Sequence, residues 1–205
     1  MRRGAAAKPS ECRPAGLAAD EAATLMHVRP ALPADAARVA AIYAPYVTHR
    51  GVSFEEAPPD AAEMAARMAK LNGLFPWLVA EQDAEVLGYA YAGSFRARAA
   101  YRFAVETTVY VAEEAHRRGV GRLLYRHLLA TLRAQGFTQA IAIIALPNHA
   151  SVRLHESFGF EAVGLNRRVG WKDGHWVDVG IWQLELCDSG AAPTEPQPFS
   201  ATGTP

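Results

Sequence analysis

Apolar residues follow two spacings along this chain, and together they predict a series of strands and helices between Met26 and Leu186. Alternating or continuous apolar runs predict strands, whereas apolar residues three and four positions apart predict helices. The expected elements, in chain order, are a strand at 26–30, a helix around 39–47, a helix at 60–71, strands at 77–81, 85–94 and 104–112, a helix at 119–135, a strand at 140–146, a helix at 148–158, and strands at 161–169 and 176–186. Pro45 should kink or end the first of these helices.

The segment from 104 to 146 indicates the fold class. Its last part, Ala140 to Leu146, is an unbroken apolar run that is typical of a strand covered on both faces. A strand, a helix and a second strand in this order favour a parallel pair joined by a right-handed crossover. The other strands follow one another as antiparallel meanders, so we expect a mixed α/β fold.

Both ends of the chain differ in composition from its middle. Residues 1–25 are rich in Ala, Arg, Gly and Pro and lack a periodic apolar pattern, so we expect a disordered N-terminal extension, and Met26 is a candidate for the true start. Residues 188–205 contain four prolines and are expected to form a disordered C-terminal tail. One domain should therefore occupy residues 26–187.

Composition excludes several classes of function. The 205 residues carry 21 basic and 21 acidic side chains, which gives no case for nucleic acid or an anionic membrane as a partner. No apolar run approaches the roughly 20 residues that span a bilayer. Cys12 and Cys187 form neither a disulfide framework nor a zinc pattern, and no other metal-ligand spacing occurs, so we expect a cytoplasmic protein without a metal.

A glycine pair, Gly119 and Gly121, at the start of the helix expected at 119–135 is the most informative feature. A glycine-rich turn that leads into a helix presents several unpaired N–H groups to one point, and arginines add charge and bidentate donors. The turn therefore predicts a phosphate site, with the ionisable Glu106 one strand away, and a solvated helix cap is the alternative. A P-loop is excluded because no Gly-Lys-Ser/Thr follows at the required glycine spacing. A dinucleotide-binding fold is excluded because a third glycine and a distant ribose-binding acid are not placed correctly. The residues of the predicted site are Arg117, Arg118, Gly119, Val120, Gly121 and Arg122.

This turn resembles the cofactor signature of the GNAT N-acetyltransferase superfamily, which is Gln or Arg, two residues, Gly, one residue, and Gly or Ala. The same frame runs here from His116 to Gly121, with His in place of Gln or Arg. The backbone N–H of His116 can still serve a ligand. The second motif of the superfamily is matched by Asn148, Ser151, Glu156, Gly159 and Phe160.

The closer resemblance is to phosphinothricin N-acetyltransferases and their relatives acting on methionine sulfoximine and methionine sulfone. It covers about Val28 to Leu186 and implies the GNAT fold, with a mixed, mostly antiparallel sheet, a splayed parallel strand pair and flanking helices. It also implies a homodimer. The matching segments, in the same order as in the family, are Phe75-Pro76-Trp77, Tyr89 to Gly93, Arg98 with Tyr101, Val105 to Val111, Leu146-Pro147-Asn148, Ser151 to Glu156, and Asp178 to Leu184.

The resemblance assigns the catalytic chemistry to Glu106 and His155. An amine usually arrives protonated, so its acetylation needs a base, and Glu106 is expected to take this role because its apolar strand should raise its pKa. The alternative is a solvated carboxylate or an ion pair with Arg96 or Arg98. His155 stands where many GNAT enzymes carry a proton-donating tyrosine, so it should protonate the leaving thiolate or orient the amine. A structural, backbone-bonded histidine is the alternative there.

The resemblance also implies acetyl-CoA as cosubstrate, with pantetheine between the strands at 104–112 and 140–146 and the diphosphate on the glycine turn. A backbone N–H of the first of these strands would hold the thioester oxygen. Beyond the turn, the expected cofactor-binding residues are Val109, Tyr110, Val111, Asn148 and Ser151. A substrate carboxylate would pair with an arginine guanidinium. The alternatives are that the two arginines are ordinary surface residues and that the aromatic residues pack in the core. The expected substrate-binding residues are Phe54, Arg96, Arg98, Tyr101 and Thr108.

These residues predict an acetyl-CoA-dependent N-acetyltransferase for the α-amine of phosphinothricin, methionine sulfoximine or methionine sulfone. Neither Cys nor Ser is placed as a nucleophile, so direct transfer in a ternary complex is expected. A different acceptor is the first alternative, namely a polyamine, an aminoglycoside or a protein N-terminus; such acceptors favour an acidic pocket, which Arg96 and Arg98 argue against. The second alternative is a non-catalytic acetyl-CoA-binding module.

Overall fold

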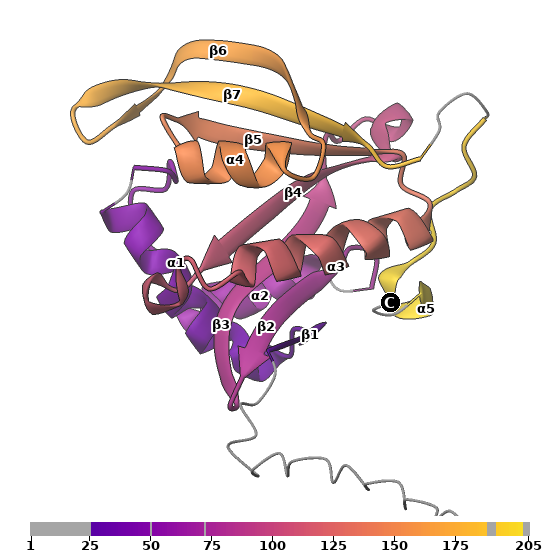
Figure 1. Ribbon diagram of the computed structural model, residues 1–205, viewed down its shortest axis with the longest axis horizontal. Coiled ribbons are helices and arrows are strands. Elements are labelled where there is room, and N and C mark those ends of the chain that lie inside the picture. Colours follow the sequence, from indigo (N-terminus) through magenta and orange to yellow (C-terminus); the bar gives the residue numbers. More distant parts are fainter. Residues whose placement is uncertain (1–25, 50, 72, 188–191, 203–205) are drawn as a thin grey trace, which may run out of the picture.

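An open sheet of seven strands organises the protein, in the order β1-β2-β3-β4-β5-β7-β6 (Figure 1). The computed structural model describes residues 26–49, 51–71, 73–187 and 192–202, so the predicted extension at 1–25 lies outside the described residues. Neighbouring strands are antiparallel except β4 and β5, which are parallel. The strands are β1 (His27–Pro30), β2 (Trp77–Gln82), β3 (Glu85–Ser94), β4 (Ala104–Val111), β5 (Gln139–Leu146), β6 (Glu161–Lys172) and β7 (His175–Glu185).

Helices cover both faces of the sheet around β3. Gly88 of β3 faces α3, because a Cβ at this position would meet side chains of that helix, whereas the next residue, Tyr89, joins the aromatic cluster that includes Tyr43 of α1. Consecutive strand residues point to opposite faces, so α1 and α3 lie on opposite sides. The helices are α1 (Ala36–Thr48), α2 (Ala61–Leu71), α3 (Val120–Gln135), α4 (His149–Glu156) and α5 (Phe199–Thr202), with short 3₁₀ turns at Pro33–Asp35, Ala99–Tyr101 and Glu113–Ala115. None of the helices in the described part of the chain is long and apolar enough to cross a membrane.

The single parallel pair within a mostly antiparallel sheet confirms the predicted fold class, and the main elements occur in the predicted order. Two local details refine the prediction. Of the two outcomes expected for Pro45, a kink or an end of the helix, the second does not occur, because α1 continues to Thr48; Ala41, whose carbonyl loses its partner, is exposed to water. The strand predicted at 161–169 extends to Lys172, because Asp173 and Gly174 adopt φ values of 49° and 79° and close a tight hairpin.

The C-terminal segment from 192 to 202 packs on the end of α3, which differs from the predicted disordered tail. Gln135 is buried, and its side-chain Nε2 donates to the carbonyl oxygens of Leu74 and Gln197 at 2.7 and 2.8 Å. The backbone N–H of Gln197 returns a hydrogen bond to the carbonyl of Gln135 at 2.7 Å. A buried amide needs such partners, so the end of α3 holds this segment in place. The other residues of the predicted tail lie outside the described residues.

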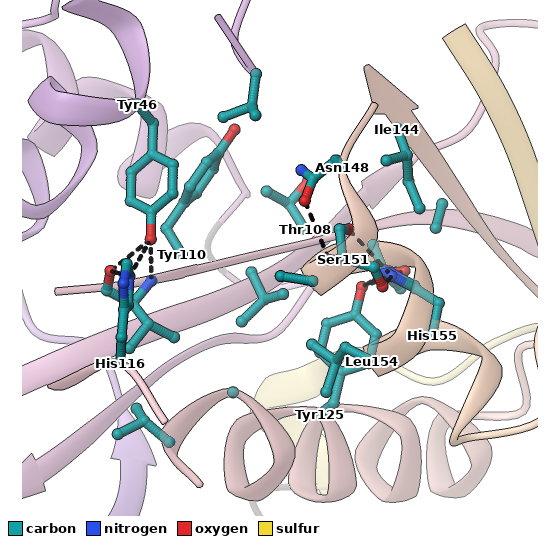
Figure 2. A pocket seen from close by; sticks show the side chains of 18 of the residues that line it. Tyr46, Thr108, Tyr110, His116, Tyr125, Ile144, Asn148, Ser151, Leu154 and His155 are labelled. Carbon is teal, nitrogen blue, oxygen red and sulfur yellow. Dashed lines mark hydrogen bonds between the residues drawn. The ribbon is translucent and has the colours of Figure 1, made fainter. Parts of the chain in front are cut away.

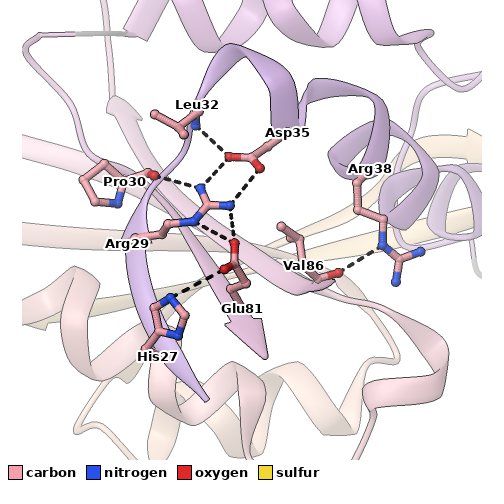
Figure 3. A network of polar contacts seen from close by, with 8 residues as sticks. All are labelled: His27, Arg29, Pro30, Leu32, Asp35, Arg38, Glu81 and Val86. Carbon is pink, nitrogen blue, oxygen red and sulfur yellow. Dashed lines mark hydrogen bonds and ion pairs between the residues drawn. The ribbon is translucent and has the colours of Figure 1, made fainter. Parts of the chain in front are cut away.

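An ion-pair cluster joins β1 to β2 and to the start of α1 (Figure 3). The guanidinium of Arg29 donates to both Asp35 oxygens at 2.7 and 2.9 Å, and its Nε donates to Glu81 Oε2 at 2.8 Å. Asp35 Oδ2 also accepts from the backbone N–H of Leu32 at 2.7 Å. The hydrogen bond from Arg29 lowers the pKa of Asp35 below its ordinary value. The cluster fixes the beginning of the helix that carries Tyr43 and Tyr46.

Candidate active site

The strands β4 and β5 separate partway along their length and open a cavity between them. Their parallel pairing covers Ala104–Glu106 on β4 and Gln139–Ile141 on β5, with Glu106 opposite Ile141 as the last pair. Beyond this pair lies a cavity of about 1080 Å³, with residues 107–111 on one wall and residues 142–145 on the other. The N-termini of α3 and α4 border the same cavity. Figure 2 shows some of the side chains that line it.

Glu106 lies at the point where the two strands diverge and lines the cavity. Burial raises the pKa of its carboxyl group above the ordinary value, while the positive charge of Arg96 opposes this shift to a smaller extent. In the described part of the chain Glu106 forms no salt bridge with Arg96 or Arg98. The environment therefore favours a carboxylate that binds a proton readily, which a general base requires.

His155 of α4 is buried, with 3% exposure, and is paired with Tyr125 of α3 (Figure 2). Its Nδ1 lies 2.8 Å from the carbonyl oxygen of Ser151, which can only accept, so Nδ1 carries the proton in the tautomer that the network requires. Nε2 therefore accepts from the Tyr125 hydroxyl at 2.6 Å. Burial lowers the pKa of His155 and raises that of Tyr125. Both groups are thus held neutral near pH 7.

Tyr125 was missed by the sequence analysis, although its hydroxyl lies at the base of the cavity. It falls on the apolar face of α3 beside Leu124 and Leu128, so the sequence alone suggests an ordinary core residue. The structure buries it fully. Its hydroxyl also lies 3.1 Å from Thr107 Oγ1 on β4. A buried tyrosine usually finds a partner for its hydroxyl, but the sequence does not reveal that this partner is a catalytic candidate.

The glycine turn adopts the backbone that a phosphate site requires. Gly119 has φ of 83° and stands at the N-cap of α3 with no side-chain cap, and Arg117 has φ of 62°. Nothing lies within 4 Å of a Cβ built on Gly119, so the turn is open to a ligand. The N–H groups and partial positive charge of the helix N-terminus therefore point into accessible space.

Most of the predicted cofactor-binding residues meet at this cavity. Arg118 is the exception, because its guanidinium donates to Gln82 Oε1 at 2.7 Å instead. Asn148 caps α4 by accepting from the N–H of Ser151 at 3.1 Å, and both residues reach the cavity. The predicted residues that line it are Val109, Tyr110, Val111, Arg117, Gly119, Val120, Gly121, Arg122, Asn148 and Ser151.

Of the predicted substrate-binding residues, Thr108 lines the cavity and the other four do not. Phe54 packs instead on β6, where a Cβ on Gly170 would lie 2.3 Å from its ring. Arg96 stacks over Phe95 at 5.0 Å from the ring centroid, and Phe95 contacts Tyr101 edge to face at 5.8 Å. Arg98 is exposed at the start of the 3₁₀ turn Ala99–Tyr101. None of these four residues therefore lines the cavity.

Two further tyrosines that the sequence analysis did not single out also line the cavity. Tyr46 projects from α1 toward the end of β4, and Tyr91 of β3 lies near Thr108. Within the described residues, no group of three His, Cys, Asp or Glu side chains is placed to bind a metal ion. The ionisable and hydrogen-bonding groups that the cavity brings together include the half-buried carboxylate of Glu106, the Tyr125–His155 pair and the N–H groups at the start of α3.

Comparison with known proteins gives a consistent assignment. The family model for an acetyltransferase (GNAT) domain matches residues 28–181. A phosphinothricin N-acetyltransferase from Streptomyces viridochromogenes is 43% identical over 84% of this chain and 92% of its own length. An L-methionine sulfoximine/L-methionine sulfone acetyltransferase from Pseudomonas paraeruginosa is 38% identical over 81% of this chain and 98% of its own length.

The same assignment follows from structure. The crystal structure of a phosphinothricin acetyltransferase from Sinorhizobium meliloti, solved with acetyl-CoA, superposes with a TM-score of 0.80 at 39% identity, covering 84% of this chain and 95% of that one. The residues 28–181 matched by the family model include the divergent strand pair and the glycine turn. The chain belongs to the GNAT acetyltransferase family, and it is an enzyme that uses acetyl-CoA as its acetyl donor.

Proposed function

We propose that this enzyme acetylates the α-amine of a small amino acid that carries a tetrahedral phosphorus or sulfur group. Phosphinothricin, methionine sulfoximine and methionine sulfone are the leading substrates, because relatives at 43% and 38% identity are named for them. The observation that carries the proposal is the position of Glu106, at the point where β4 and β5 separate, in a cavity whose other end is the N-terminus of α3.

The residues around the cavity fit the donor. Arg117 and Arg122 and the open turn at Gly119 supply charge and N–H groups for the diphosphate. In the described residues the pairing of β4 with β5 ends at Glu106, so the part of β4 beyond it offers backbone groups for the pantetheine amides. The thioester would then lie toward the divergence point and Glu106, where an N–H of the strand from Thr108 to Val111 can stabilise the oxyanion.

In the proposed mechanism Glu106 removes a proton from the amine, and the neutral nitrogen attacks the thioester carbon directly. The C–N bond forms and the C–S bond breaks. The nitrogen then loses a second proton, which balances the proton gained by sulfur, and the first proton passes from Glu106 to water. Ser151 is not an alternative nucleophile: its Oγ lies 3.3 Å from His155 Nδ1, but that nitrogen already donates to the Ser151 carbonyl and cannot accept the hydroxyl proton. Among the residues that the structure describes, no cysteine lines the cavity, and we therefore favour direct transfer.

We assign His155 to positioning rather than to direct proton donation. A proton donor would need the imidazolium, yet burial lowers the pKa of His155 and its Nε2 already accepts from Tyr125. The neutral imidazole instead fixes the Tyr125 hydroxyl at the base of the cavity. This phenol is the group of the pair that can donate a hydrogen bond to the leaving sulfur, once it turns away from His155.

Arg96 would bind the carboxylate of the acceptor. Its positive charge lowers the pKa of the Glu106 carboxyl, so it acts on the same site. We expect Arg96→Ala to raise the KM for methionine sulfone about tenfold, with the KM for acetyl-CoA unchanged, because one charge-assisted hydrogen bond contributes roughly 1.5–3 kcal/mol. Arg98→Ala, on the same loop, is the matched control and should change neither constant. Thiol release from acetyl-CoA measures both.

The same assay tests the substrate class with a matched panel. Methionine sulfone should be acetylated, whereas 3-(methylsulfonyl)propylamine, which differs by the absence of the carboxylate, should not. Methionine keeps the amino-acid backbone but lacks the sulfone oxygens, so its turnover separates recognition of the sulfone from recognition of the backbone. Preferred turnover of a polyamine over every amino acid, or a larger loss in Arg98→Ala than in Arg96→Ala, would contradict the proposed acceptor.

We further propose a homodimer formed through β6. This strand is the edge of the sheet, and every residue from Glu161 to Val169 is exposed. Its exposed apolar side chains include Leu165 and Val169, and the Trp171–Trp176 pair lies at its hairpin end. An open edge strand with apolar side chains is prone to pair with another chain. A second copy offers the same surface and can close it by two-fold symmetry.

Light scattering after size exclusion tests this dimer. The wild type should elute at twice the monomer mass, and the combined change Leu165→Lys and Val169→Lys should yield monomers, because two buried charges would face each other across the interface. Leu74→Lys is the control, since Leu74 is 45% exposed and Leu165 is 49% exposed. A monomeric wild type, or a dimer that survives the double change, would rule out this interface.

A further inference from the structure

The side chain of His116 points toward Tyr46 and the end of β4 (Figure 2). His116 stands at the first position of the glycine signature, three residues before Gly119. Its Nε2 lies 2.9 Å from the Tyr46 hydroxyl and 3.1 Å from the carbonyl oxygen of Val111. Tyr46, Val111 and His116 all line the cavity. The ring thus joins the phosphate turn to α1 and to the cavity wall.

The hydrogen-bond roles in this cluster follow from counting protons. The Val111 carbonyl can only accept, and the Tyr46 hydroxyl donates its one proton to it at 2.6 Å. Nε2 must then carry a proton as well, which it shares between Tyr46 and Val111. The tautomer is assigned from this network. The cluster is therefore a closed arrangement in which Tyr46 and His116 both donate to one carbonyl.

The cluster controls the path of the chain between the cavity wall and α3. The N–H of Ala112 is bound to the Leu87 carbonyl at 2.9 Å, which holds the beginning of this connection on β3. His116 holds its far end, and the left-handed backbone of Arg117 and Gly119 follows directly. Tyr46 is itself fixed by an edge-to-face contact with Tyr110, with ring centroids 4.8 Å apart. A shift of His116 would therefore move the N–H groups of the turn.

We propose that His116 is a positioning residue for the donor: with Tyr46 it fastens the phosphate turn to Val111, and its side chain does not itself contact the diphosphate. This inference rests on the use of acetyl-CoA, which the family establishes, and does not depend on the acceptor. The amide of Gln can replace Nε2–H as a donor to Val111, whereas Ala removes the donor and lets the turn shift. The effect should appear only with donors that carry a diphosphate.

The test compares acetyl-CoA with S-acetylpantetheine, which lacks the nucleotide and the diphosphate. His116→Ala should raise the KM for acetyl-CoA and the calorimetric Kd for CoA about tenfold, the effect of losing one hydrogen bond to a well-ordered partner, with kcat unchanged. Its kcat/KM with S-acetylpantetheine should equal that of the wild type. His116→Gln should restore CoA affinity to within about threefold.

A double-mutant cycle separates this role from direct contact. Tyr46→Phe keeps the ring and removes the hydroxyl, so it should raise the Kd for CoA in the same direction, and the Tyr46→Phe, His116→Ala double variant should be no worse than His116→Ala alone. Additive losses, unchanged CoA affinity in His116→Ala, or an equal loss with S-acetylpantetheine would overturn the proposal. Calorimetry with CoA gives this answer even if the proposed acceptors prove wrong.

Discussion

Replacing Glu106 with Gln is expected to lower turnover by about 10²–10⁴-fold, the range that a general base contributes, while acetyl-CoA affinity is retained. Gln has nearly the same shape as Glu but cannot take a proton from the attacking amine. Because Glu106 lies where β4 and β5 separate, the substitution alters one carboxyl group without disturbing the walls that would hold pantetheine. Thiol release and calorimetry with CoA measure the two quantities.

The pH dependence of activity should report the ionisation of Glu106. Burial raises the pKa of Glu106 above its ordinary value, so activity should rise with pH through an apparent pKa higher than the roughly 4.3 of a free glutamate. Below that pKa the carboxyl is protonated and cannot act as a base. Arg96→Ala removes the charge that lowers this pKa, so the acid limb should move to higher pH.

Glu113→Gln provides the matched control, because Glu113 lines the same cavity at its other end. It should keep both turnover and the acid limb of the wild type. Turnover of Glu106→Gln within about threefold of the wild type would remove Glu106 from the mechanism, since it is far below the general-base range. An equal loss in Glu113→Gln would indicate a loss of cavity charge rather than of a base.

The second large effect is expected at Gly88 of β3, where Ala should lower the free energy of unfolding by about 2 kcal/mol, in the range of overpacked cores. A Cβ on Gly88 would lie 2.9 Å from the backbone oxygen of Tyr110 and 3.0 Å from Val120 Cγ1. The oxygen belongs to β4 and cannot move aside, so α3 or the sheet must shift. Denaturant unfolding followed by tyrosine and tryptophan fluorescence measures the loss.

Val120 begins α3, so the same change should also weaken donor binding. Moving the first turn of the helix moves the N–H groups beside Gly119, and the KM for acetyl-CoA should rise. Gly93→Ala is the control on the same strand, because its Cβ would meet only Leu71 Cδ2, at 3.9 Å. Equal stability of the two alanine variants would show that the contact between α3 and β3 adjusts freely.

The sequence predicted the parts of the site that depend on backbone and local pattern. The glycine turn, the parallel strand pair and the strand position of Glu106 can be predicted from spacing, whereas the divergence of the pair was implied by the family resemblance. The directions of Tyr125 and Tyr46 could not be, since each hydroxyl finds its partner on another element. Arg118 looked equivalent to Arg117 in sequence, yet a side chain across the surface, Gln82, binds it.

The positions of the expected substrate-binding residues were even harder to predict from the sequence. Phe54 was expected in the pocket, but Gly170 leaves a space on β6 that its ring fills instead. That contact joins residues more than a hundred positions apart and leaves no periodic trace in the sequence. Arg96 does not line the cavity, and its guanidinium stacks over the neighbouring Phe95 ring, a side-chain orientation that the sequence pattern does not reveal.

The docked segment from 192 to 202 has a practical consequence for truncated versions of this protein. Cutting the chain at the limit of the family match, residue 181, would remove the last residues of β7 as well as Gln197. The side-chain amide of Gln135 would lose one acceptor and its backbone carbonyl would lose a donor, both at a position that water reaches poorly. The smallest fragment expected to fold fully is therefore longer than the conserved acetyltransferase domain.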